Sequence, residues 1–467
     1  MIQVLRVDTP TLGDRSYLAH DGEVALVVDP QRDIDRISDL AAERGLRITH
    51  VAETHMHNDY VSGGLALARG AAAAYLVNAA DPVGFDRTAV RDGDSVPVGT
   101  AMSVRVLATP GHTFNHLSYV LESAGQVVGV FTGGSLLYGS TGRPDLLGPD
   151  NTAALAHAQF RSAHRLASEL PDSAEIFPTH GFGSFCAATQ AQALSSTIGR
   201  EKQFNPVLTA DEQAYIETLL TGLDAWPAYY AHMGPANIAG PDGPDLSPPR
   251  RADAGEVRRR IEAGEWVIDL RGRVAFAAGF VPGSFSFPLD GSFATYLGWV
   301  IPWGTPLTLL GETPEQVGQA QRELVRIGID RPAAAAAGRP EDWSGGQPLA
   351  SMRLAKFSDL AAALSTSGHD GELVVLDVRR RLEWEESHIA GAVHIPFSEL
   401  PGRANEIPPG QVWVHCHTGY RSVVAASMLA ARGRSVISID DQFENAERAA
   451  VSLTRPLIPR AQAPITS

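Results

Sequence analysis

Cysteine is scarce in this chain of 467 residues, which contains only Cys186 and Cys416, 230 positions apart. Two such distant cysteines cannot build the disulfide framework of a small secreted protein. The first 15 residues also lack the basic start, apolar centre and small-residue cleavage site of a secretory signal peptide. We therefore expect a reducing, cytoplasmic location.

Basic charge and long apolar runs are scarce as well. The 38 Lys and Arg residues face 53 Asp and Glu residues, so the formal net charge is −15. Without an excess of positive charge to neutralise phosphates, we expect no nucleic-acid partner. The longest apolar stretch, residues 65–80, is interrupted by Arg69 and Asn78. It falls short of the roughly 18 apolar residues that cross a bilayer, so we expect no membrane partner.

The length and the 44% hydrophobic content favour two to four domains with large cores. Short β-rich runs alternate with helical patterns over the first 200 residues, which predicts an α/β layer. A helical pattern at 209–223 is followed by a segment crowded with proline and glycine. This change of composition predicts a domain boundary near residue 246.

An internal duplication follows this boundary. The apolar runs EWVIDLRGR at 265–273 and ELVVLDVRR at 372–380 both lead into a glycine-containing segment that ends in a small apolar run and proline. The two runs lie about 108 residues apart, as expected of repeated domains. Between them, residues 331–348 are rich in alanine, glycine and proline, which predicts a linker.

Four histidines follow predicted strands of the first layer. His55 and His57 stand two apart after the strand ITHVAET, and His112 and His180 follow two later strands. Imidazoles gathered at strand ends can bind one metal ion, so the pattern predicts a metal site. The alternative is that each histidine caps a strand or pairs with backbone groups.

The segment THMHNDY at 54–60 resembles the HxHxDH signature of the metallo-β-lactamase fold superfamily, in its glyoxalase II and persulfide dioxygenase branch. The resemblance continues through TPGHT, FTGG, GRPDLLG and PTHGF and covers about residues 1–205. It implies an αββα sandwich. It also implies metal-site positions at His55, His57, Asp59, His112 and His180.

Two departures from this family pattern concern the number of metal ions. Tyr60 stands where the signature has its last histidine, and Gly134 stands where the family has an aspartate that bridges two ions. The resemblance therefore implies one ion, Fe(II) or else zinc, and disfavours a two-metal hydrolase. Restoring the carboxylate with Gly134→Asp is expected to tighten iron binding. For Tyr60 we expect a space-filling role rather than a hydrogen bond in the cavity.

The third ligand of that single ion is left open. Persulfide dioxygenases hold one Fe(II) with two histidines and the aspartate, and His55 and His112 remain here. The third ligand is then His57, or a nearby carboxylate such as Asp59 or Asp145. Arg143, in GRPD, is a candidate for binding an acidic thiol carrier, because a guanidinium suits carboxylates; the alternative is an arginine that braces the loop.

A second site is predicted around Cys416. The strand QVWVH leads into the loop Cys416–Arg421, and a helical pattern follows directly. Backbone N–H groups of such a loop and the positive end of the helix would stabilise a thiolate or an anionic adduct. Arg421 can brace loop carbonyls or bind an anion. Cys186 has no such loop, so we expect it to be a small buried apolar residue.

This cysteine loop resembles that of the rhodanese family, as does LDVRRRLEWEESHIAGAVHIP. Related phosphatases have one more residue before the arginine, so sulfur transfer is preferred to phosphate chemistry. The first copy has LTLLGETPEQ at the loop position and no cysteine, so it is expected to be silent. We thus predict an α/β chain with four parts: a metallo-β-lactamase-like domain (1–205), a helical extension and linker (206–245), a degenerate rhodanese-like domain (246–345) and an active rhodanese domain (350–460).

These resemblances imply a persulfide dioxygenase coupled to a sulfurtransferase in sulfide detoxification. Its partners would be low-molecular-weight thiol persulfides and thiosulfate or sulfite, and a homo-oligomer is possible. One alternative is a metal-dependent thioester hydrolase, with Asp59 near the metal-bound hydroxide as base. Another is a metal-free scaffold that docks thiol carriers beside an active sulfurtransferase.

Overall fold

The computed structural model describes residues 2–366 and 373–455 of the chain. They belong to two compact units: residues 1–245 with 325–328 form the first, and residues 246–324 with those from 329 onward form the second. The last positions of the predicted 350–460 domain, 456–460, lie outside the described residues. Within the described ranges, no helix combines the length and the apolar character needed to cross a bilayer.

The first sheet of the first unit has six strands in sequence order, β1 to β6. Strands β1 to β3 form an antiparallel meander, and β3 to β6 run parallel. The crossovers after β3 and β4 contain α1 (Asp35–Glu43) and α2 (Gly64–Ala71). The strands are β1 (Gln3–Thr9), β2 (Asp14–His20), β3 (Val24–Val28), β4 (Arg47–Ala52), β5 (Ala74–Asn78) and β6 (Thr88–Val90).

The second sheet has five strands in the order β11-β10-β9-β8-β7. β9 and β10 are joined by a turn at Ala124 and Gly125, whose φ angles of 49° and 74° suit a tight hairpin. β11 joins the edge in parallel after the long helix α3 (Pro149–Glu169). The strands are β7 (Ser95–Val98), β8 (Met102–Ala108), β9 (Leu117–Ser123), β10 (Gln126–Gly133) and β11 (Glu175–Pro178).

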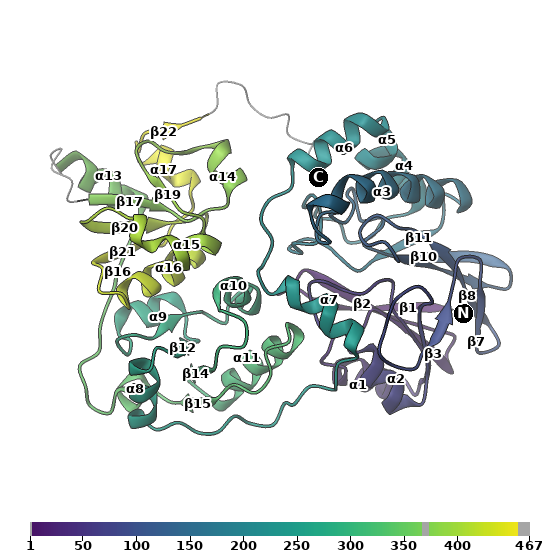
Figure 1. Ribbon diagram of the computed structural model, residues 1–467, viewed down its shortest axis with the longest axis horizontal. Coiled ribbons are helices and arrows are strands. Elements are labelled where there is room, and N and C mark those ends of the chain that lie inside the picture. The colour runs from purple at the N-terminus through teal and green to yellow at the C-terminus, as the bar shows by residue number, and fades with distance from the viewer. Residues whose placement is uncertain (1, 367–372, 456–467) are drawn as a thin grey trace. The chain divides into compact units, whose positions relative to one another are not determined.

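Helices cover the outer faces of both sheets (Figure 1). Side chains alternate along β2, where Tyr17 packs between the sheets and Leu18 packs in the cluster on the opposite side. α3 packs on the second sheet with α4 (Ile198–Phe204), α5 (Pro206–Thr209) and α6 (Glu212–Thr221) nearby, and α7 (Tyr230–Ala239) follows. β2 is therefore buried on both of its faces. The αββα sandwich implied by the sequence is confirmed.

The second unit begins with a four-stranded parallel sheet in the order β13-β12-β14-β15. The predicted linker at 331–348 is wrong, because its alanines form β15, which pairs with β14, and Trp343 behind them is buried. Backbone pairing with a neighbouring strand outweighs the low strand propensity of alanine. The elements are α8 (Ala254–Glu262), β12 (Trp266–Asp269), α9 (Arg273–Ala278), β13 (Phe285–Ser286), α10 (Phe293–Val300), β14 (Leu307–Gly311), α11 (Pro314–Arg326), β15 (Ala334–Ala337) and α12 (Pro340–Ser344).

The second sheet of this unit is also parallel, with the order β16-β21-β20-β17-β19. Its central strand β20 leads directly into the buried helix α16. A short antiparallel pair, β18 with β22, lies beside it. The elements are β16 (Arg353–Ala355), α13 (Phe357–Thr366), β17 (Leu373–Asp377), α14 (Arg381–Glu386), β18 (His388–Ile389), β19 (Val393–His394), α15 (Leu400–Arg403), β20 (Gln411–His415), α16 (Tyr420–Ala430), β21 (Val436–Ile439), α17 (Glu444–Arg448) and β22 (Leu453–Thr454).

Candidate functional site

The four predicted histidines meet in the interior of the first unit. His55 and His57 follow β4, His112 follows β8 and His180 follows β11. All four are at most 1% exposed. The ring centroids of His55 and His112 lie 4.8 Å apart, and those of His112 and His180 lie 5.0 Å apart. The two sheets thus bring together residues up to 125 positions apart in the sequence.

Three of these imidazoles are arranged as metal ligands. In His55, His112 and His180, the buried Nε2 atom makes no hydrogen bond to any described residue. Each of the three can offer one atom within 4.8 Å of the atoms of the others. The Nδ1 atoms are engaged instead, with Thr54 Oγ1 at 2.9 Å, the Arg143 carbonyl at 2.8 Å and Asp14 Oδ1 at 2.9 Å, respectively. Such bonds leave Nε2 available to an ion.

Burial controls the charge of these rings. It is the main cause that holds the pKa values of His55 and His112 well below the ordinary value, so both are neutral. Burial alone also lowers the pKa of His180, but the charge of Asp59 and the hydrogen bond to Asp14 raise it to about 9. The donor set fits one metal ion, because imidazoles with free nitrogens are its common ligands and His180 would release its proton on binding.

His57 is held differently from the other three. Its Nε2 lies 3.1 Å from Glu53 Oε2, 3.3 Å from Asp29 Oδ1 and 3.0 Å from the Tyr60 hydroxyl. Burial lowers its pKa, but the charge of Asp29 and the hydrogen bonds to Asp29 and Glu53 raise it to about 10 overall. Its Nδ1 atom makes no hydrogen bond to any described residue, so His57 and His180 both offer a free nitrogen. Only His180 falls in one ligand group with His55 and His112, so the geometry favours His180 as the third nitrogen ligand.

Tyr60 does more than fill space. Its hydroxyl bonds His57 and also lies 3.3 Å from the Asp29 carbonyl oxygen. The structure thus shows the hydrogen-bonded alternative rather than the expected space-filling role.

Asp29 and Glu53 were not singled out in the sequence, although each follows an apolar strand, β3 or β4. A buried carboxylate at a strand end is the signal that could have found them.

Gly134 leaves no room for the carboxylate that the family pattern has there. A Cβ atom at this position would lie 2.4 Å from Cδ2 and 2.6 Å from Cγ of His112. His116, another residue that the sequence analysis missed, accepts a hydrogen bond from the Gly134 N–H at 3.0 Å and stacks on His55. This close packing of the loop on a candidate ligand argues against the expectation that Gly134→Asp tightens iron binding.

The carboxylates proposed as a third ligand have other partners. Asp59 Oδ2 lies 3.2 Å from His180 Nδ1, and Asp59 belongs to a second possible ligand group with His57 and His180. Burial raises the pKa of Asp59, but the charge of His180 lowers it below the ordinary value overall, so Asp59 is ionised. Asp145 instead binds the guanidinium of Arg143 through two contacts of 2.6 and 2.7 Å. The ion pair with Arg143 thus engages both carboxylate oxygens of Asp145.

Arg143 is 4% exposed and braces its loop. Besides Asp145, its guanidinium donates to the carbonyl oxygens of Phe185 and Asp224 at 3.3 and 2.6 Å. These bonds favour the loop-bracing alternative over the binding of a thiol carrier.

Burial, together with the charge of Asp59, raises the pKa of the Cys186 thiol well above its ordinary value, so this thiol is protonated.

The helical extension contributes a residue that the sequence analysis placed in a proline- and glycine-rich segment. Asn237, in α7, donates to the carbonyl oxygens of His57 at 2.8 Å and Tyr60 at 2.9 Å. Its Oδ1 accepts the N–H of Ser62 at 2.8 Å. One buried amide thus satisfies three backbone groups of the loop after β4. No local sequence pattern links positions that lie about 180 residues apart.

Cys416 lies 2% exposed in the turn between β20 and α16. The N–H of Gly419 donates to its Sγ atom at 3.2 Å. The loop needs a glycine there because Gly419 has φ = +106°. The strand, loop and helix around the cysteine are arranged as the sequence predicts, with the start of α16 next to the thiol.

Arg421 points to a partner that the sequence analysis missed. Its two terminal nitrogens bind the two carboxylate oxygens of Glu383, in α14, at 2.7 Å each. Burial raises the pKa of Glu383, but Arg421 lowers it below the ordinary value overall. Arg421 thus places a buried, paired positive charge at the base of the loop instead of bracing loop carbonyls.

Each of the two sheets of the second unit has an equivalent buried ion pair between an aspartate and an arginine. Asp269 and Asp377, which end β12 and β17, stand 108 residues apart, and so do their partners Arg271 and Arg379. In both pairs the arginine NH2 atom lies 2.6 Å from the aspartate Oδ2 atom. In the first copy only residues 312 and 313 separate β14 from α11. In the second copy, the four residues 416–419 separate β20 from α16, so the first copy lacks a loop of that length.

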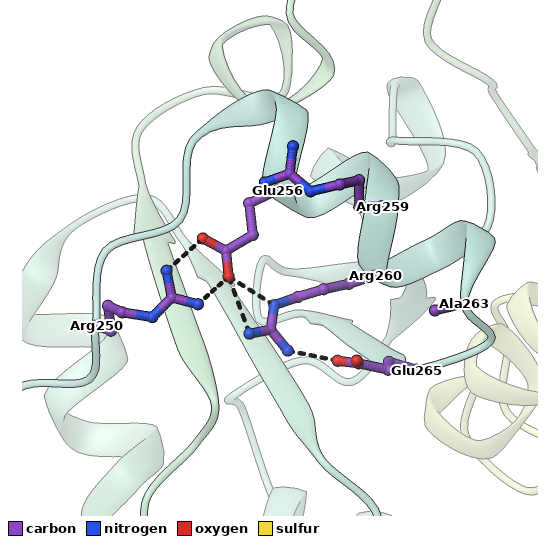
Figure 2. A pocket seen from close by; sticks show the side chains of 6 residues that line it. All are labelled: Arg250, Glu256, Arg259, Arg260, Ala263 and Glu265. Carbon is purple, nitrogen blue, oxygen red and sulfur yellow. Dashed lines mark hydrogen bonds and ion pairs between the residues drawn. The ribbon is translucent and has the colours of Figure 1, made fainter.

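A surface pocket of the second unit lies beside α8 (Figure 2). Arg250 and Arg260 both bind the carboxylate of Glu256, and Arg260 also binds Glu265. Because these guanidinium groups have carboxylate partners already, the pocket offers an anion little uncompensated charge. The lining residues are Arg250, Glu256, Arg259, Arg260, Ala263 and Glu265. It contains neither the histidines nor the cysteine loop.

Comparison with known proteins identifies both regions. The model of the metallo-beta-lactamase superfamily matches residues 12–180. A hydroxyacylglutathione hydrolase from Cupriavidus taiwanensis is 31% identical over 222 residues, which cover 42% of this chain and 83% of the relative. The chain belongs to the metallo-β-lactamase superfamily. The model of the rhodanese-like domain matches residues 359–449, so this superfamily member also carries a C-terminal rhodanese domain.

Two further relatives are similar to this chain, one over its N-terminal region and one over most of its length. The human mitochondrial persulfide dioxygenase ETHE1 is 27% identical over 213 residues, which cover 45% of this chain and 75% of the relative. A crystal structure of a metallo-beta-lactamase from Staphylococcus aureus covers 72% of this chain and 99% of its own, with 28% identity and a TM-score of 0.64. The metallo-β-lactamase fold, the C-terminal rhodanese domain and both family resemblances are confirmed, whereas the rhodanese-like identity of residues 246–345 stays a prediction. The superfamily and the histidine cluster indicate an enzyme that binds a metal ion.

Proposed function

We propose that the metallo-β-lactamase domain oxidises a low-molecular-weight thiol persulfide with oxygen, and that Cys416 transfers sulfane sulfur. The observation that carries the first half is the set of three buried imidazoles, His55, His112 and His180, with free Nε2 atoms beside a glycine at position 134. One ion fits this set, and no carboxylate is available at position 134 to bridge a second. The likeness to the human persulfide dioxygenase supports the same assignment.

The chain's own residues would prepare the site for a thiol substrate. The Nδ1 bonds of His55 and His112 fix the tautomer that presents Nε2, and burial keeps bulk water away. Asp59 and Asp14 hold the orientation of His180. An iron ion bound by the three imidazoles would supply the redox chemistry between the persulfide sulfur and oxygen.

The second half of the proposal concerns the rhodanese domain. The thiolate of Cys416 would attack the outer sulfur of thiosulfate, forming a cysteine persulfide while sulfite leaves with the electron pair of the broken S–S bond. The Gly419 N–H and the positive end of α16 would stabilise the anionic sulfur. A thiol acceptor would then remove the sulfane sulfur and regenerate Cys416. We further propose the four-part division given above, with a silent rhodanese copy at 246–345.

One alternative has specific support. The hydroxyacylglutathione hydrolase of C. taiwanensis is as similar to the N-terminal region as the dioxygenase, which favours a metal-dependent thioester hydrolase. In that case Asp59 would be the base near a metal-bound hydroxide. If the first domain were a metal-free scaffold, it would show neither persulfide oxidation nor thioester hydrolysis.

The deciding experiment measures iron and zinc content of the full-length protein and oxygen uptake on addition of glutathione persulfide. We expect about one metal ion per chain and oxygen uptake that is lost, together with the metal, in His55→Ala, His112→Ala and His180→Ala. The matched variant His57→Ala should retain most of its metal, because Glu53 and Asp29 already bind that ring.

Three results would refute this proposal. Two tightly bound ions per chain contradict the single site. Thioester hydrolysis without oxygen uptake favours the hydrolase. Metal loss in His57→Ala with retention in His180→Ala would exchange the roles assigned to these two histidines.

A further inference from the structure

One peptide group of the cysteine loop is bonded at both ends. The carbonyl oxygen of Thr418 accepts a hydrogen bond from Arg273 NH1 at 3.0 Å. The N–H of the same peptide, on Gly419, donates to Cys416 Sγ at 3.2 Å. Because a trans peptide is planar, its C=O and N–H point in opposite directions. A group that holds the carbonyl outward therefore holds the N–H toward the sulfur.

Arg273 comes from a distant part of the sequence. It begins α9 in the first copy, 145 residues before Thr418, and both lie in the second compact unit. Its NH1 atom also pairs with Asp440 Oδ1 at 2.9 Å, with side-chain exposures of 27% for Arg273 and 20% for Asp440. Two acceptors on one nitrogen fix the position of the guanidinium more firmly than a single surface contact would.

The same two side chains pack against the loop. A Cβ atom on Gly419 would lie 2.3 Å from Asp440 Oδ1 and 2.6 Å from Arg273 NH1. The next residue, Tyr420, makes a second contact with the first copy. Its hydroxyl donates to the Pro288 carbonyl at 2.8 Å. The ring of Tyr420 also lies 5.1 Å from that of Tyr296, in α10. The first copy therefore contacts the loop at the Thr418 carbonyl and at the side chain of Tyr420.

We propose that Arg273 is a positioning residue for Cys416: the silent copy holds the Thr418–Gly419 peptide in the orientation in which its N–H stabilises the cysteine thiolate. This inference rests on the proposed sulfur-transfer function, because it names a residue that prepares the same nucleophile. It gives the catalytically silent copy a task in the chemistry of the active one. Without Arg273 the peptide can rotate and turn a carbonyl oxygen, instead of an N–H, toward the sulfur.

The test measures alkylation of Cys416 by iodoacetamide in the full-length protein, over a range of pH, with the modified peptide quantified by mass spectrometry. Arg273→Met should slow alkylation about tenfold at neutral pH and shift the pH–rate profile to higher pH, because one hydrogen bond to an anionic sulfur is lost. Arg273→Lys, which keeps a donor and the charge, should restore most of the rate. Arg259→Met, on the exposed face of α8, is the control and should not change it.

A further variant separates positioning from simple electrostatics. Asp440→Ala removes a negative charge near the loop, so a purely electrostatic effect would speed alkylation. If Asp440 acts by holding Arg273, the same variant slows alkylation. Faster alkylation in Asp440→Ala, or a wild-type profile in Arg273→Met, would overturn the proposal. Either result can be obtained even if one of the two variants does not fold.

The measurement also distinguishes this inference from the proposed function. Alkylation needs no sulfur donor, so it reports on the loop alone. If the wild type fails to transfer sulfur from thiosulfate but Arg273→Met still slows alkylation, positioning stands and the sulfur-transfer function fails. If the wild type transfers sulfur and Arg273→Met alkylates at the wild-type rate, the function stands and positioning fails.

Discussion

Gly134 is the position at which the structure makes the sharpest prediction. A methyl group there would lie 2.4 Å from Cδ2 of His112, well inside van der Waals contact. The ring has little freedom to yield, because its Nδ1 bonds the Arg143 carbonyl and Gly142 packs against its Nδ1 and Cγ atoms. A Cβ on Gly142 would lie 2.7 Å from that Nδ1. Gly134→Ala must therefore displace either the loop or the imidazole.

The expected loss follows from this overpacking. Forcing a methyl group into a closely packed interior costs roughly 1–3 kcal/mol of folding free energy. Displacing a ligand from its supporting bonds lowers metal affinity by about 10- to 100-fold. We expect both effects in Gly134→Ala and a larger loss in Gly134→Asp, which adds a charged group at the same point. Neither variant should gain metal.

The assay combines urea unfolding of the first unit with metal content after competition with a chelator. Gly70→Ala is the matched control, because Gly70 lies in α2 with open space around its Cα atom. Alanine in a helix should raise the free energy of unfolding by about 0.5–1 kcal/mol and leave metal content unchanged. Tighter metal binding in Gly134→Asp, or wild-type stability in Gly134→Ala, would refute the argument.

Three more predictions concern other bonds in the molecule. Cys416→Ser should abolish sulfur transfer from thiosulfate with metal content unchanged, whereas Cys186→Ser should leave transfer intact; a persulfide on Cys186 by mass spectrometry would contradict this. Glu383→Gln should lower the unfolding free energy of the second unit by roughly 2–3 kcal/mol, because the buried charge of Arg421 loses its partner; an unchanged urea midpoint would contradict it. Asn237→Ala should cost roughly 2–3 kcal/mol in the first unit and lower metal retention, since three backbone groups lose a buried partner; metal retention equal to that of the wild type would argue against that role.

The sequence by itself determined where the chemistry lies. His55, His112 and His180 each follow an apolar strand, and parallel or paired strands bring their ends to one edge. Cys416 stands between a strand and a helix, with four residues between it and Arg421. Such signals are local: a short run of residues specifies the element, and the element's end places the side chain. The local patterns predicted an α/β layer, and the resemblance to the metallo-β-lactamase fold implied the αββα sandwich.

Only the tertiary structure decided how these residues are used. Asp29 and Glu53 hold the Nε2 atom of His57, and the loop at Gly134 packs on His112 where the family pattern has a carboxylate. Arg273 reaches Thr418 across 145 residues. Contacts between such distant positions leave no periodic signal in a single sequence, because they depend on how separately formed elements pack. The shortage of space beside His112 is equally invisible in the sequence, since it arises from two loops that meet only in the folded chain.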